Sequence, residues 1–340
     1  MNIKAVAEKA GVSITTVSRV LNRPEMVSEK TKENVLAVMK QMDYTPNWFA
    51  RNILSKKTNV IGLLIPDVRN PANLEIAKGV EDAAHQKGYN VMFCNTEYQK
   101  EKELQYIDTL LERRVDGLIL TSSQLSIAQV EAIKKKDAEC VLIGKTIDDV
   151  QADMIFVDYV SVTQEAIGHL LRMGRKNIGI LLSEHPKVEE REKLEGYKCA
   201  LAEAGISFCR EMVSVGEQTM EGGYVAMGKL LQGGCPPDAV FASTDQMALG
   251  VMEKLKQMGI SVPNDIAVVG CDDLEFGAVM EPGLTTITRP MYRMGLMAAR
   301  LLFDNLEEEP PQREGQKIIL QAKLKIRKSC GNKERIREIW

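Results

Sequence analysis

Between Val60 and Asp272 the chain repeats one pattern, in which a short and almost wholly apolar run precedes a longer stretch with apolar residues at helical spacing. Strands that are apolar along their whole length are buried on both faces, and parallel strands need a crossover to connect them. The pattern therefore predicts parallel sheets covered by helices on both sides. It occurs twice in succession, on either side of residue 158, so we expect two similar doubly wound lobes.

The expected elements follow from these two series. The first series has strands VIGLLIPD (60–67), NVMFCNT (90–96), DGLILTS (116–122), CVLIGK (140–145) and MIFVDY (154–159), with helices over 72–87, 101–113 and 127–136. The second has strands over 177–183, 212–215, 239–244 and 266–272, with helices over 161–173, 190–204, 220–232 and 245–258. LTTITRP (284–290), a helix over 291–305 and a final strand pair in IILQAKLKIRKS complete the core.

The first 22 residues show a different pattern, that of two short helices joined by a turn. Apolar residues at helical spacing from Ile3 to Ala7 form one stripe, and Gly11 suits the helix end because glycine adopts a left-handed backbone without strain. Ser13 can cap a second helix from about Ile14 to Leu21. Such a pair makes a helix-turn-helix, whose second helix can enter a DNA major groove. The alternative is an ordinary helical hairpin with a solvated polar face.

The second helix supplies the first DNA-contact candidates. Its beginning would reach base edges, and polar residues further along it can bond phosphates. The base-edge candidates are Ile14, Thr15 and Thr16, and the phosphate candidates are Ser18, Arg19 and Asn22.

A third helix and a charge asymmetry favour DNA binding over the plain hairpin. Ser28 is a natural N-cap for a helix with an apolar face from Val35 to Met42, so three helices can close a small core. The first 59 residues contain ten Lys or Arg and five Asp or Glu, a net charge of +5, whereas the whole chain carries −3. The rest of the chain therefore carries −8. A basic head on an acidic body is typical of a nucleic-acid binder.

These segments resemble the lactose/galactose-repressor (LacI/GalR) family of transcription regulators. The resemblance is carried by AVAEKAGVSITTVSRVLN, VSEKT, DYTPNWFARNIL and KKTNVIGLLIPD, and it extends over nearly the whole chain. It implies an N-terminal all-α helix-turn-helix head and an α/β core of the periplasmic-binding-protein type, with two doubly wound parallel-sheet lobes. It also implies a homodimer, most often a repressor, on a near-palindromic operator, with Thr31 in VSEKT as a further DNA contact.

The resemblance implies a hinge helix between head and core. Pro46 keeps Thr45 extended and Asn47 can cap a helix to Leu54, which is far shorter than the roughly 12–15 residues needed for stability alone in water. We therefore expect the helix to form only on DNA, where in the family a leucine pries a minor-groove base step apart. A plain linker is the alternative. The minor-groove candidates are Asn47, Ala50, Arg51, Ile53 as the wedge, and Leu54 beside it.

The same resemblance implies the domain boundaries. The chain would comprise a helix-turn-helix domain (1–45), a hinge and linker (46–59), an effector-binding and dimerisation core (60–330) and a tail (331–340) too short for the leucine-heptad helix of tetrameric relatives. Three segments would cross between the lobes, near Asp158, Thr286 and Gln321. One lobe would then hold about 60–158 and 287–320, and the other about 159–286 and 321–330.

Polar residues gather where the predicted strands end. In open parallel sheets ligands bind beyond the carboxyl ends of the strands, and two facing lobes make a cleft that can close on a small molecule. Carboxylates and amides there suit sugar hydroxyls, although each could instead form a turn or cap a helix, as Asp245 could for helix 245–258. The candidates are Asp67, Asn70, Asn73, Ser122, Ser123, Lys145, Thr244, Asp245, Asp272 and Asp273.

The family pattern singles out some cleft residues and is altered at others. GCDD (270–273) implies that Asp272 contacts the effector, whereas R-L-x-G-[FYW] reads KLEGY and places Lys193 where the family has an arginine. Lysine cannot reproduce the planar fork of arginine. N-P-F-F and V-D-N-x-x-G read NPAN and VDYVSV. These departures leave open a sugar, a sugar phosphate or other charged ligand held by Lys193, Arg191 or Lys145, or a weak site.

A competing interpretation comes from one branch of the family. QKEKELQYIDTLLERRVDG and RPMYRMG resemble the catabolite control protein A branch, whose members are activated by a serine-phosphorylated phosphocarrier protein. Tyr292 and Arg300 fall where that branch contacts its partner. Arg293 replaces an acidic residue and Asp304 a basic one, so the two reversed charges would penalise the same partner.

Other functional classes lack their motifs. The chain has no G-x-G-x-x-G at a strand–helix turn, no G-x-x-x-x-G-K-[ST] and no convincing nucleophile–base set, so we expect no enzyme. Seven scattered cysteines without a C-x-x-C and three isolated histidines predict reduced cysteines, no metal site and no cofactor. A transport-type sugar-binding protein would lack the basic head and need a secretion signal. Because neither a signal region nor an apolar run of eighteen residues occurs, we expect a cytoplasmic protein without a membrane partner.

Overall fold

The computed structural model describes residues 3–22, 24–44, 57–136, 138–144, 152–185, 187–307 and 315–331 of the 340-residue chain. The chain divides into two compact units, Met1–Asn59 and Val60–Trp340. Each unit folds around apolar side chains of its own.

The N-terminal unit is a small helical bundle. Its elements are α1 (Ile3–Ala10), α2 (Ile14–Asn22), the 3-10 helix η1 (Pro24–Met26) and α3 (Glu29–Gln41). Their apolar faces meet in one core, which contains Val6, Ala7, Ala10, Val17, Val20, Val35, Val38 and Met39. Ser28 accepts a hydrogen bond from the backbone of Thr31, which confirms the predicted cap of α3.

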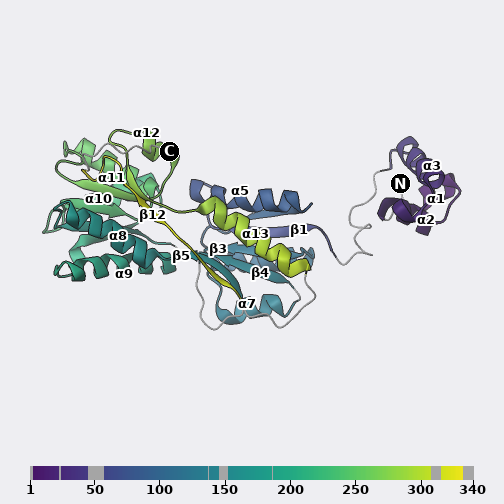
Figure 1. Cartoon of the computed structure of the whole chain (residues 1–340), viewed down its shortest axis with the longest axis horizontal. Coiled ribbons are helices and arrows are strands. Elements are labelled where there is room, and N and C mark those ends of the chain that lie inside the picture. Colours follow the sequence, from purple (N-terminus) through teal and green to yellow (C-terminus); the bar gives the residue numbers. More distant parts are fainter. Residues whose placement is uncertain are drawn as a thin grey trace. The chain divides into compact units, whose positions relative to one another are not determined.

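The second unit contains two lobes (Figure 1). The first lobe consists of β1 (Val60–Ile65), α5 (Pro71–Gln86), β2 (Asn90–Asn95), α6 (Lys100–Glu112), β3 (Gly117–Thr121), α7 (Ile127–Lys134), β4 (Glu139–Ile143), β5 (Asp153–Val157), α13 (Met291–Glu307) and β11 (Lys317–Leu320). The second consists of α8 (Tyr159–Arg172), β6 (Ile178–Ser183), α9 (Lys187–Glu203), η2 (Arg210–Met212), β7 (Val213–Gly216), α10 (Met220–Leu231), β8 (Ala239–Ala242), α11 (Asp245–Gln257), β9 (Ala267–Asp272), α12 (Glu275–Val279), β10 (Thr285–Thr288) and β12 (Lys323–Lys325).

The two sheets have the same topology. The first has strand order β11-β5-β4-β3-β1-β2, and the second has β12-β10-β9-β8-β6-β7, so each position in one sheet has a counterpart in the other. The neighbouring strands pair in parallel, except that β12 runs antiparallel to β10. The predicted fold class, a helix-turn-helix head with an α/β core of two doubly wound lobes, is confirmed.

Both faces of each sheet are covered, as the continuous apolar runs predicted. In the first lobe, Ile119 packs in the cluster that includes α5 and α13, whereas its neighbours Leu118 and Leu120 pack with α6 and α7. In the second lobe, Ile180 packs with α8 and α9, and Leu181 packs with α10 and α11. This alternation explains why each strand is apolar at successive positions.

The chain crosses between the lobes three times. Asp158 links β5 to α8, residues 289–290 link β10 to α13, and residues 321–322 link β11 to β12. The second crossing follows the expected position near Thr286, because β10 keeps its pairing with β9 as far as Thr288. Any movement of one lobe against the other must therefore bend these short segments.

Two helix starts differ from the sequence-based prediction by more than one residue. The helix expected over 161–173 begins at Tyr159, because the Asp158 side chain accepts a hydrogen bond from the backbone of Ser161 and caps it. The helix expected over 190–204 begins at Lys187. The earlier start of α9 places Glu189 and Glu190 in its first turn, and the Glu190 carboxylate accepts from the Ser183 N–H at the end of β6.

Helices α5 and α13 pack unusually closely on the first sheet, side by side in Figure 1. A Cβ built on Gly79 of α5 would lie 2.1 Å from the carbonyl oxygen of Tyr292. A Cβ on Gly295 of α13 would lie 2.0 Å from the carbonyl oxygen of Ile76. Only glycine fits at these two positions, and the contact fixes the start of α13 against the middle of α5.

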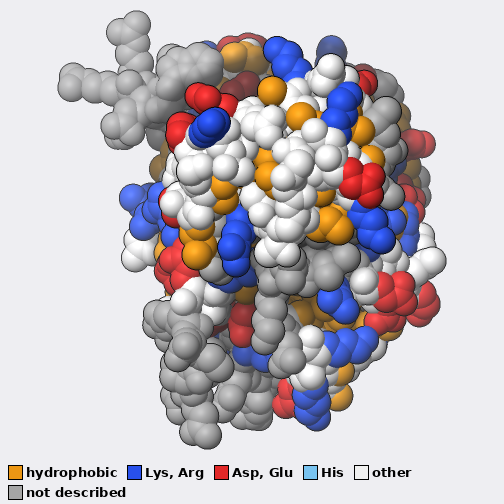
Figure 2. Space-filling view, turned by 90° about the vertical axis from the view of Figure 1, so that its right-hand side faces the viewer, with side chains coloured by type: hydrophobic (Ala, Val, Ile, Leu, Met, Phe, Trp, Pro, Cys, Tyr) orange, Lys and Arg blue, Asp and Glu red, His pale blue; other side chains and the backbone are white. Residues whose placement is uncertain are grey.

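One face of the molecule carries side chains of every kind. Figure 2 shows Lys and Arg side chains interleaved with Asp, Glu and hydrophobic side chains on the face that it presents. Among the helices that the structure describes, none is long and apolar enough to cross a membrane.

Candidate functional site

The turn between α1 and α2 is held by short-range hydrogen bonds. Gly11 has a φ of +68°, in the left-handed region, and the Val12 N–H donates to the Ala7 carbonyl oxygen at 3.0 Å. The Ser13 hydroxyl oxygen accepts from the Thr16 N–H at 3.0 Å, which confirms Ser13 as the cap of α2. These bonds set the angle between the two helices of the helix-turn-helix.

One side of α2 is buried and the other is exposed. Val17 and Val20 lie in the core of the unit. Ile14 is 42% exposed, and Thr15 and Arg19 are exposed beside it. An exposed face at the beginning of the second helix is the geometry with which such helices read a major groove.

The remaining DNA candidates are less exposed to solvent or lie outside the described residues. Thr16 and Ser18 are half-buried, and the Thr16 hydroxyl lies 2.9 Å from the Ser13 hydroxyl. The Thr31 hydroxyl lies 2.9 Å from that of Ser28, at the start of α3. The Asn22 side chain and the whole of Asn47, Ala50, Arg51, Ile53 and Leu54 lie outside the described part of the chain.

In the second unit, side chains of the two lobes meet directly between the sheets. Tyr98, which follows β2, donates its hydroxyl proton to the Gln218 side-chain oxygen at 2.9 Å, and Asn70 donates to the same oxygen at 3.4 Å. The Tyr98 ring also stacks on His185, with centroids 5.4 Å apart. These contacts join loops of opposite lobes, so the structure is a closed form of the interlobe cleft.

A cluster of buried charges lies behind this contact. Lys193 donates to Glu190 at 2.7 Å and to the Ser243 carbonyl oxygen at 3.1 Å, and its ammonium lies 5.0 Å from the centre of the Tyr159 ring. Arg289, at the second crossing, donates to the carboxylate of Asp272 and to the hydroxyl of Tyr159. Glu189 lies 3.8 Å from Arg289 and 3.4 Å from the Ser122 hydroxyl. The cluster thus connects the second lobe, the crossing segment and the first lobe.

Burial changes the protonation of this cluster. Burial raises the pKa of Glu189 and of Asp272, although Arg289 acts in the opposite direction on both. Burial alone would lower the pKa of Lys193, but the neighbouring carboxylates of Glu190 and Glu189 hold it above its ordinary value. Lys193 therefore stays charged within its ion pair.

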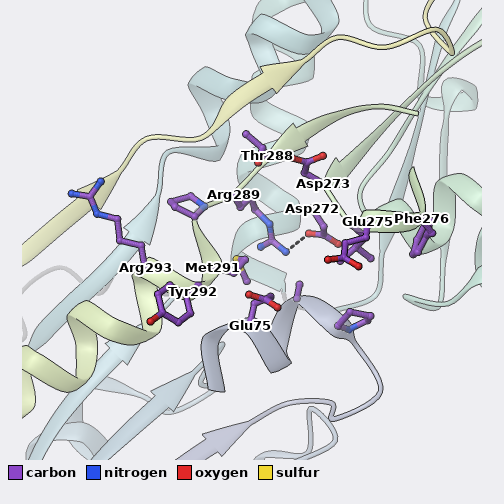
Figure 3. Close-up of a pocket in the computed structure, with 14 residues that line it drawn as sticks. Glu75, Asp272, Asp273, Glu275, Phe276, Thr288, Arg289, Met291, Tyr292 and Arg293 are labelled. Atoms are coloured by element: carbon purple, nitrogen blue, oxygen red, sulfur yellow. Dashed lines mark hydrogen bonds and ion pairs between the residues drawn. The ribbon is translucent and has the colours of Figure 1, made fainter. Parts of the chain in front are cut away.

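Two cavities lie on either side of Arg289, which lines both together with Met291. The inner cavity, between the lobes, has a volume of only about 20 Å³ and is lined by Glu189, Ser122 and Gln218 among others. The outer cavity has about 820 Å³ and opens where α5, α12 and α13 approach one another. Figure 3 shows its Arg289 side chain pointing at Asp272, with the Glu75 and Glu275 carboxylates nearby.

Comparison with known proteins identifies this architecture. The profile "Bacterial regulatory proteins, lacI family" matches residues 2–47, and "Periplasmic binding proteins and sugar binding domain of LacI family" matches residues 58–328. The chain belongs to the LacI family of DNA-binding transcription regulators. The resemblance inferred from the sequence is thereby confirmed.

Individual relatives agree with this assignment. Catabolite control protein A of Priestia megaterium is 35% identical over 311 residues, which are 91% of this chain and 93% of that protein. The lac repressor dimer bound to operator and the anti-inducer ONPF is 28% identical with a TM-score of 0.85, and the CelR–cellobiose complex is 29% identical with a TM-score of 0.73. Both comparisons cover 97% of this chain and 99% of the other. These relatives are transcription regulators, in agreement with the prediction that this LacI-family chain is no enzyme.

Of the predicted effector residues in this LacI-family core, some line the inner cavity, some line the outer cavity, and the others line neither. Asn70, Asn73 and Ser122 line the inner cavity, and Asp272 lines the outer one. Asp67 lies near them and pairs with Arg69 at 2.9 Å. Arg191 is exposed on α9, and Lys145 lies outside the described residues.

Three predicted residues are buried behind the cavities. Lys193 is 2% exposed and points at Glu190, so in this closed form its ammonium is used within the protein. Thr244, rather than Asp245, is the N-cap of α11. Asp245 instead accepts hydrogen bonds from the Leu274 N–H at 2.8 Å and from the Thr286 hydroxyl of β10. It therefore fixes the loop after β9, which carries Asp273 at the outer cavity.

Five inner-cavity residues that take part in the polar contacts described above were missed from the sequence. Tyr98 and Gln218 follow β2 and β7, so the strand-end rule that selected Asn70 could also have selected them. Glu189 was hidden by the misplaced start of α9. Tyr159 and Arg289 carry no local signal, because only the packing of the crossing segments brings them together. The missed set is Tyr98, Tyr159, Glu189, Gln218 and Arg289.

The two candidate partner-binding residues lie on the outer side of α13. Tyr292 is 39% exposed and donates its hydroxyl proton to Asp82 of α5 at 3.1 Å. Arg300 is exposed, as are Arg293 and Asp304. In the part of the chain that the structure describes, no group of three or more His, Cys, Asp or Glu side chains could hold a metal ion, and four of the seven free cysteines are buried.

Proposed function

We propose that this LacI-family member is a transcription regulator, most simply a repressor of carbohydrate-utilisation genes, whose operator affinity is set by a small molecule in the interlobe cleft. The observation that carries the proposal is the pair of units in one chain: a helix-turn-helix with an exposed α2 face and a two-lobed core closed by side-chain contacts. The solved complexes of relatives contain operator DNA in one case and cellobiose in another.

The small molecule would control operator affinity by shifting the equilibrium between the open and closed forms of the lobes. A ligand shifts such an equilibrium only by its different affinity for the two forms. The Tyr98–Gln218 and Ser122–Glu189 contacts stabilise the closed form without a ligand. An effector in the inner cavity would have to separate these partners first, because about 20 Å³ holds little more than one water molecule.

The DNA-binding part would use a homodimer on a near-palindromic operator. Two copies of α2 related by a two-fold axis would read two half-sites, since the symmetry of the site mirrors that of the protein. We further propose the boundaries given above for the head (1–45), the hinge (46–59) and the core (60–330), with the hinge forming a helix only on DNA.

The test separates the two units. The full chain and a variant without residues 1–59 are titrated into an operator fragment selected from random DNA, and both are screened by thermal shift against sugars and sugar phosphates. The proposal expects the full chain to bind DNA, the truncated chain to lose DNA binding, and both to respond to the same ligand. A full chain that selects no DNA sequence contradicts it.

Asn73→Ala serves as a cleft variant because Asn73 lines the inner cavity and donates to the Asp67 carbonyl oxygen at 2.9 Å. Lys256→Ala, at an exposed position of α11, is the matched control. The ligand response should weaken in the first variant and persist in the second.

A second candidate is control by a serine-phosphorylated phosphocarrier protein. The exposed Tyr292 and Arg300 on one helix favour it, because an arginine can pair bidentately with phosphate. Arg300→Ala should then abolish binding of that phosphoprotein in an anisotropy titration, and Lys256→Ala should not. Equal affinity for the unphosphorylated phosphocarrier protein would rule out this mode.

A further inference from the structure

The buried charges of the cleft do not balance. Five ionisable side chains, each at most 9% exposed, lie together: the carboxylates of Glu189, Glu190 and Asp272 and the cations of Lys193 and Arg289. Lys193 is paired with Glu190, and Arg289 with Asp272. With every group ionised, these five side chains have one negative charge in excess, and among their three carboxylates Glu189 has no cation of its own. The buried Asp245 beside Asp272 does not offset this excess, because it too is a carboxylate.

Two of the contacts of Glu189 are long. The Ser122 hydroxyl lies at 3.4 Å, and within the described residues the one ion pair of Glu189 is that with Arg289, at 3.8 Å. The Tyr159 hydroxyl also hydrogen-bonds Glu189, but this group is neutral and brings no positive charge. Both distances exceed those of well-formed charge-assisted hydrogen bonds, which are about 2.7–2.9 Å. An ionised carboxylate that is buried with such weak partners costs free energy, and a positive charge beside it would reduce that cost.

Unused hydrogen-bonding atoms lie in the same cluster. The second oxygen of Asp272 and the Nε of Arg289 are buried and have no hydrogen-bond partner among the described residues. Arg289 lines both cavities, and Glu189 lines the inner one. Buried polar atoms are normally satisfied, so a free acceptor and a free donor beside an underpaired carboxylate indicate space for a polar ligand.

The excess negative charge selects among ligand classes. A phosphate group would add negative charge to a cluster that already has too much of it. A neutral hydroxyl could donate to Glu189 but would leave the charge in place. An ammonium group offers three N–H donors and the missing positive charge.

We propose that the effector of this cleft carries an ammonium group, as an amino sugar does, and that Glu189 receives it. This inference rests on the proposed function, since it assigns the chemical class of the ligand at the same site. Asn70, Asn73 and Gln218, which line the same cavity, would take the neutral hydroxyls.

The experiment compares matched probes by isothermal titration calorimetry with the full chain. The probes are glucosamine, its uncharged N-acetyl derivative, glucose, glucose 6-phosphate and ethanolamine. A charge-assisted hydrogen bond predicts that an amine binds about 10- to 100-fold more tightly than its neutral counterpart at pH 7. Glu189→Gln should remove this preference, because the amide has nearly the same shape and no charge.

Two further variants keep the result interpretable. Glu189→Asp retains the charge and should retain part of the preference for amines, which a merely structural role would not predict. Glu195→Gln, at an exposed position of the same helix, is the control and should bind like the unaltered chain. Should Glu189→Gln fail to fold, Glu189→Ser replaces it as the neutral variant.

Three results would contradict the amine assignment. They are tighter binding of glucose or glucose 6-phosphate than of glucosamine, a preference for amines that persists in Glu189→Gln, and no binding of glucosamine or ethanolamine. Operator binding is measured in parallel. A chain that binds operator and releases it with a neutral sugar keeps the proposed function and loses the amine assignment. A chain that binds no operator loses the proposed function, whichever probe occupies the cleft.

Discussion

At the residue scale, the DNA-reading candidates have distinct chemical roles. Thr15 and Arg19 are both exposed on α2, but they differ in what they can contact. A threonine near the start of the helix reaches base edges, whereas an arginine one turn later reaches phosphates.

Thr15→Ala should therefore change the preferred base at one operator position, with a cost of about 1–3 kcal/mol on the preferred sequence. Arg19→Ala should weaken binding to all sequences about equally. It should also reduce the slope of log affinity against log salt concentration by about 1, the value expected for one lost phosphate contact. Anisotropy titrations on operator and scrambled DNA at several salt concentrations distinguish the two. Uniform weakening by Thr15→Ala would remove its base-reading role.

Asp245 gives a residue-scale prediction on pH. Burial raises its pKa to about 7, with the nearby Asp272 charge acting in the same direction. Since the folded-state pKa lies above the unfolded one, the native state binds a proton more tightly, and this contribution to stability is lost as the pH rises through about 7.

The free energy of unfolding should therefore fall between pH 5 and pH 8 in the unaltered chain, and fall less steeply in Asp245→Asn. Urea titrations of both chains across this range provide the measurement. Parallel pH profiles for the two chains would show that Asp245 titrates normally.

At the element scale, the close contact of α5 and α13 positions the site. Arg289 lies two residues before α13, and Asn70 caps α5, so the two helix starts carry cavity residues from distant parts of the sequence. Gly79 and Gly295 allow the start of α13 to touch the backbone in the middle of α5, which fixes the position of one helix relative to the other.

Gly295→Ala should destabilise the core by about 1–3 kcal/mol, because the added methyl group meets the Ile76 carbonyl oxygen and forces the helices apart. Gly228→Ala is the control, since a Cβ there first meets a flexible lysine side chain at 3.4 Å. Removing a helix-interior glycine at such a position should be neutral or stabilising by up to about 1 kcal/mol. Similar urea midpoints for the two variants would contradict the packing argument.

At the scale of the whole molecule, the lobes are held closed by a small number of polar contacts. Gln218 accepts from both Tyr98 and Asn70, so one side chain of the second lobe joins two loops of the first. Each hydrogen bond contributes about 1 kcal/mol net. A ligand that binds more tightly to the open form could therefore break both bonds to Gln218.

Gln218→Ala should shift the lobes towards the open form by about 1–2 kcal/mol, because both hydrogen bonds are lost. Small-angle scattering of the chain without residues 1–59 should then show a larger radius of gyration than the unaltered core. Tyr106→Phe on α6, outside both cavities, is the control. An unchanged scattering profile for Gln218→Ala would mean that the remaining contacts between the lobes, such as Ser122–Glu189 and the Tyr98–His185 stack, keep them closed without Gln218.

Much of this architecture could be predicted from the sequence because its causes are local. Continuous apolar runs separated by helical spacing specify parallel sheets covered on both faces, and Ser13 and Ser28 act as caps within three residues of their partners. The family motifs in the head and core extend the same local information over the whole chain.

The tertiary structure alone decided which polar side chains meet. Glu189, Asp272 and Arg289 are far apart in the sequence, and only the crossing segments bring them together. Lys193 donates to the Ser243 carbonyl oxygen in addition to its local pair with Glu190, and Asp245 accepts from the Leu274 N–H in the loop after β9, because buried charges need partners from the elements packed around them. Local patterns determine which elements form, whereas the pairing of buried polar groups depends on contacts between elements that no local pattern records.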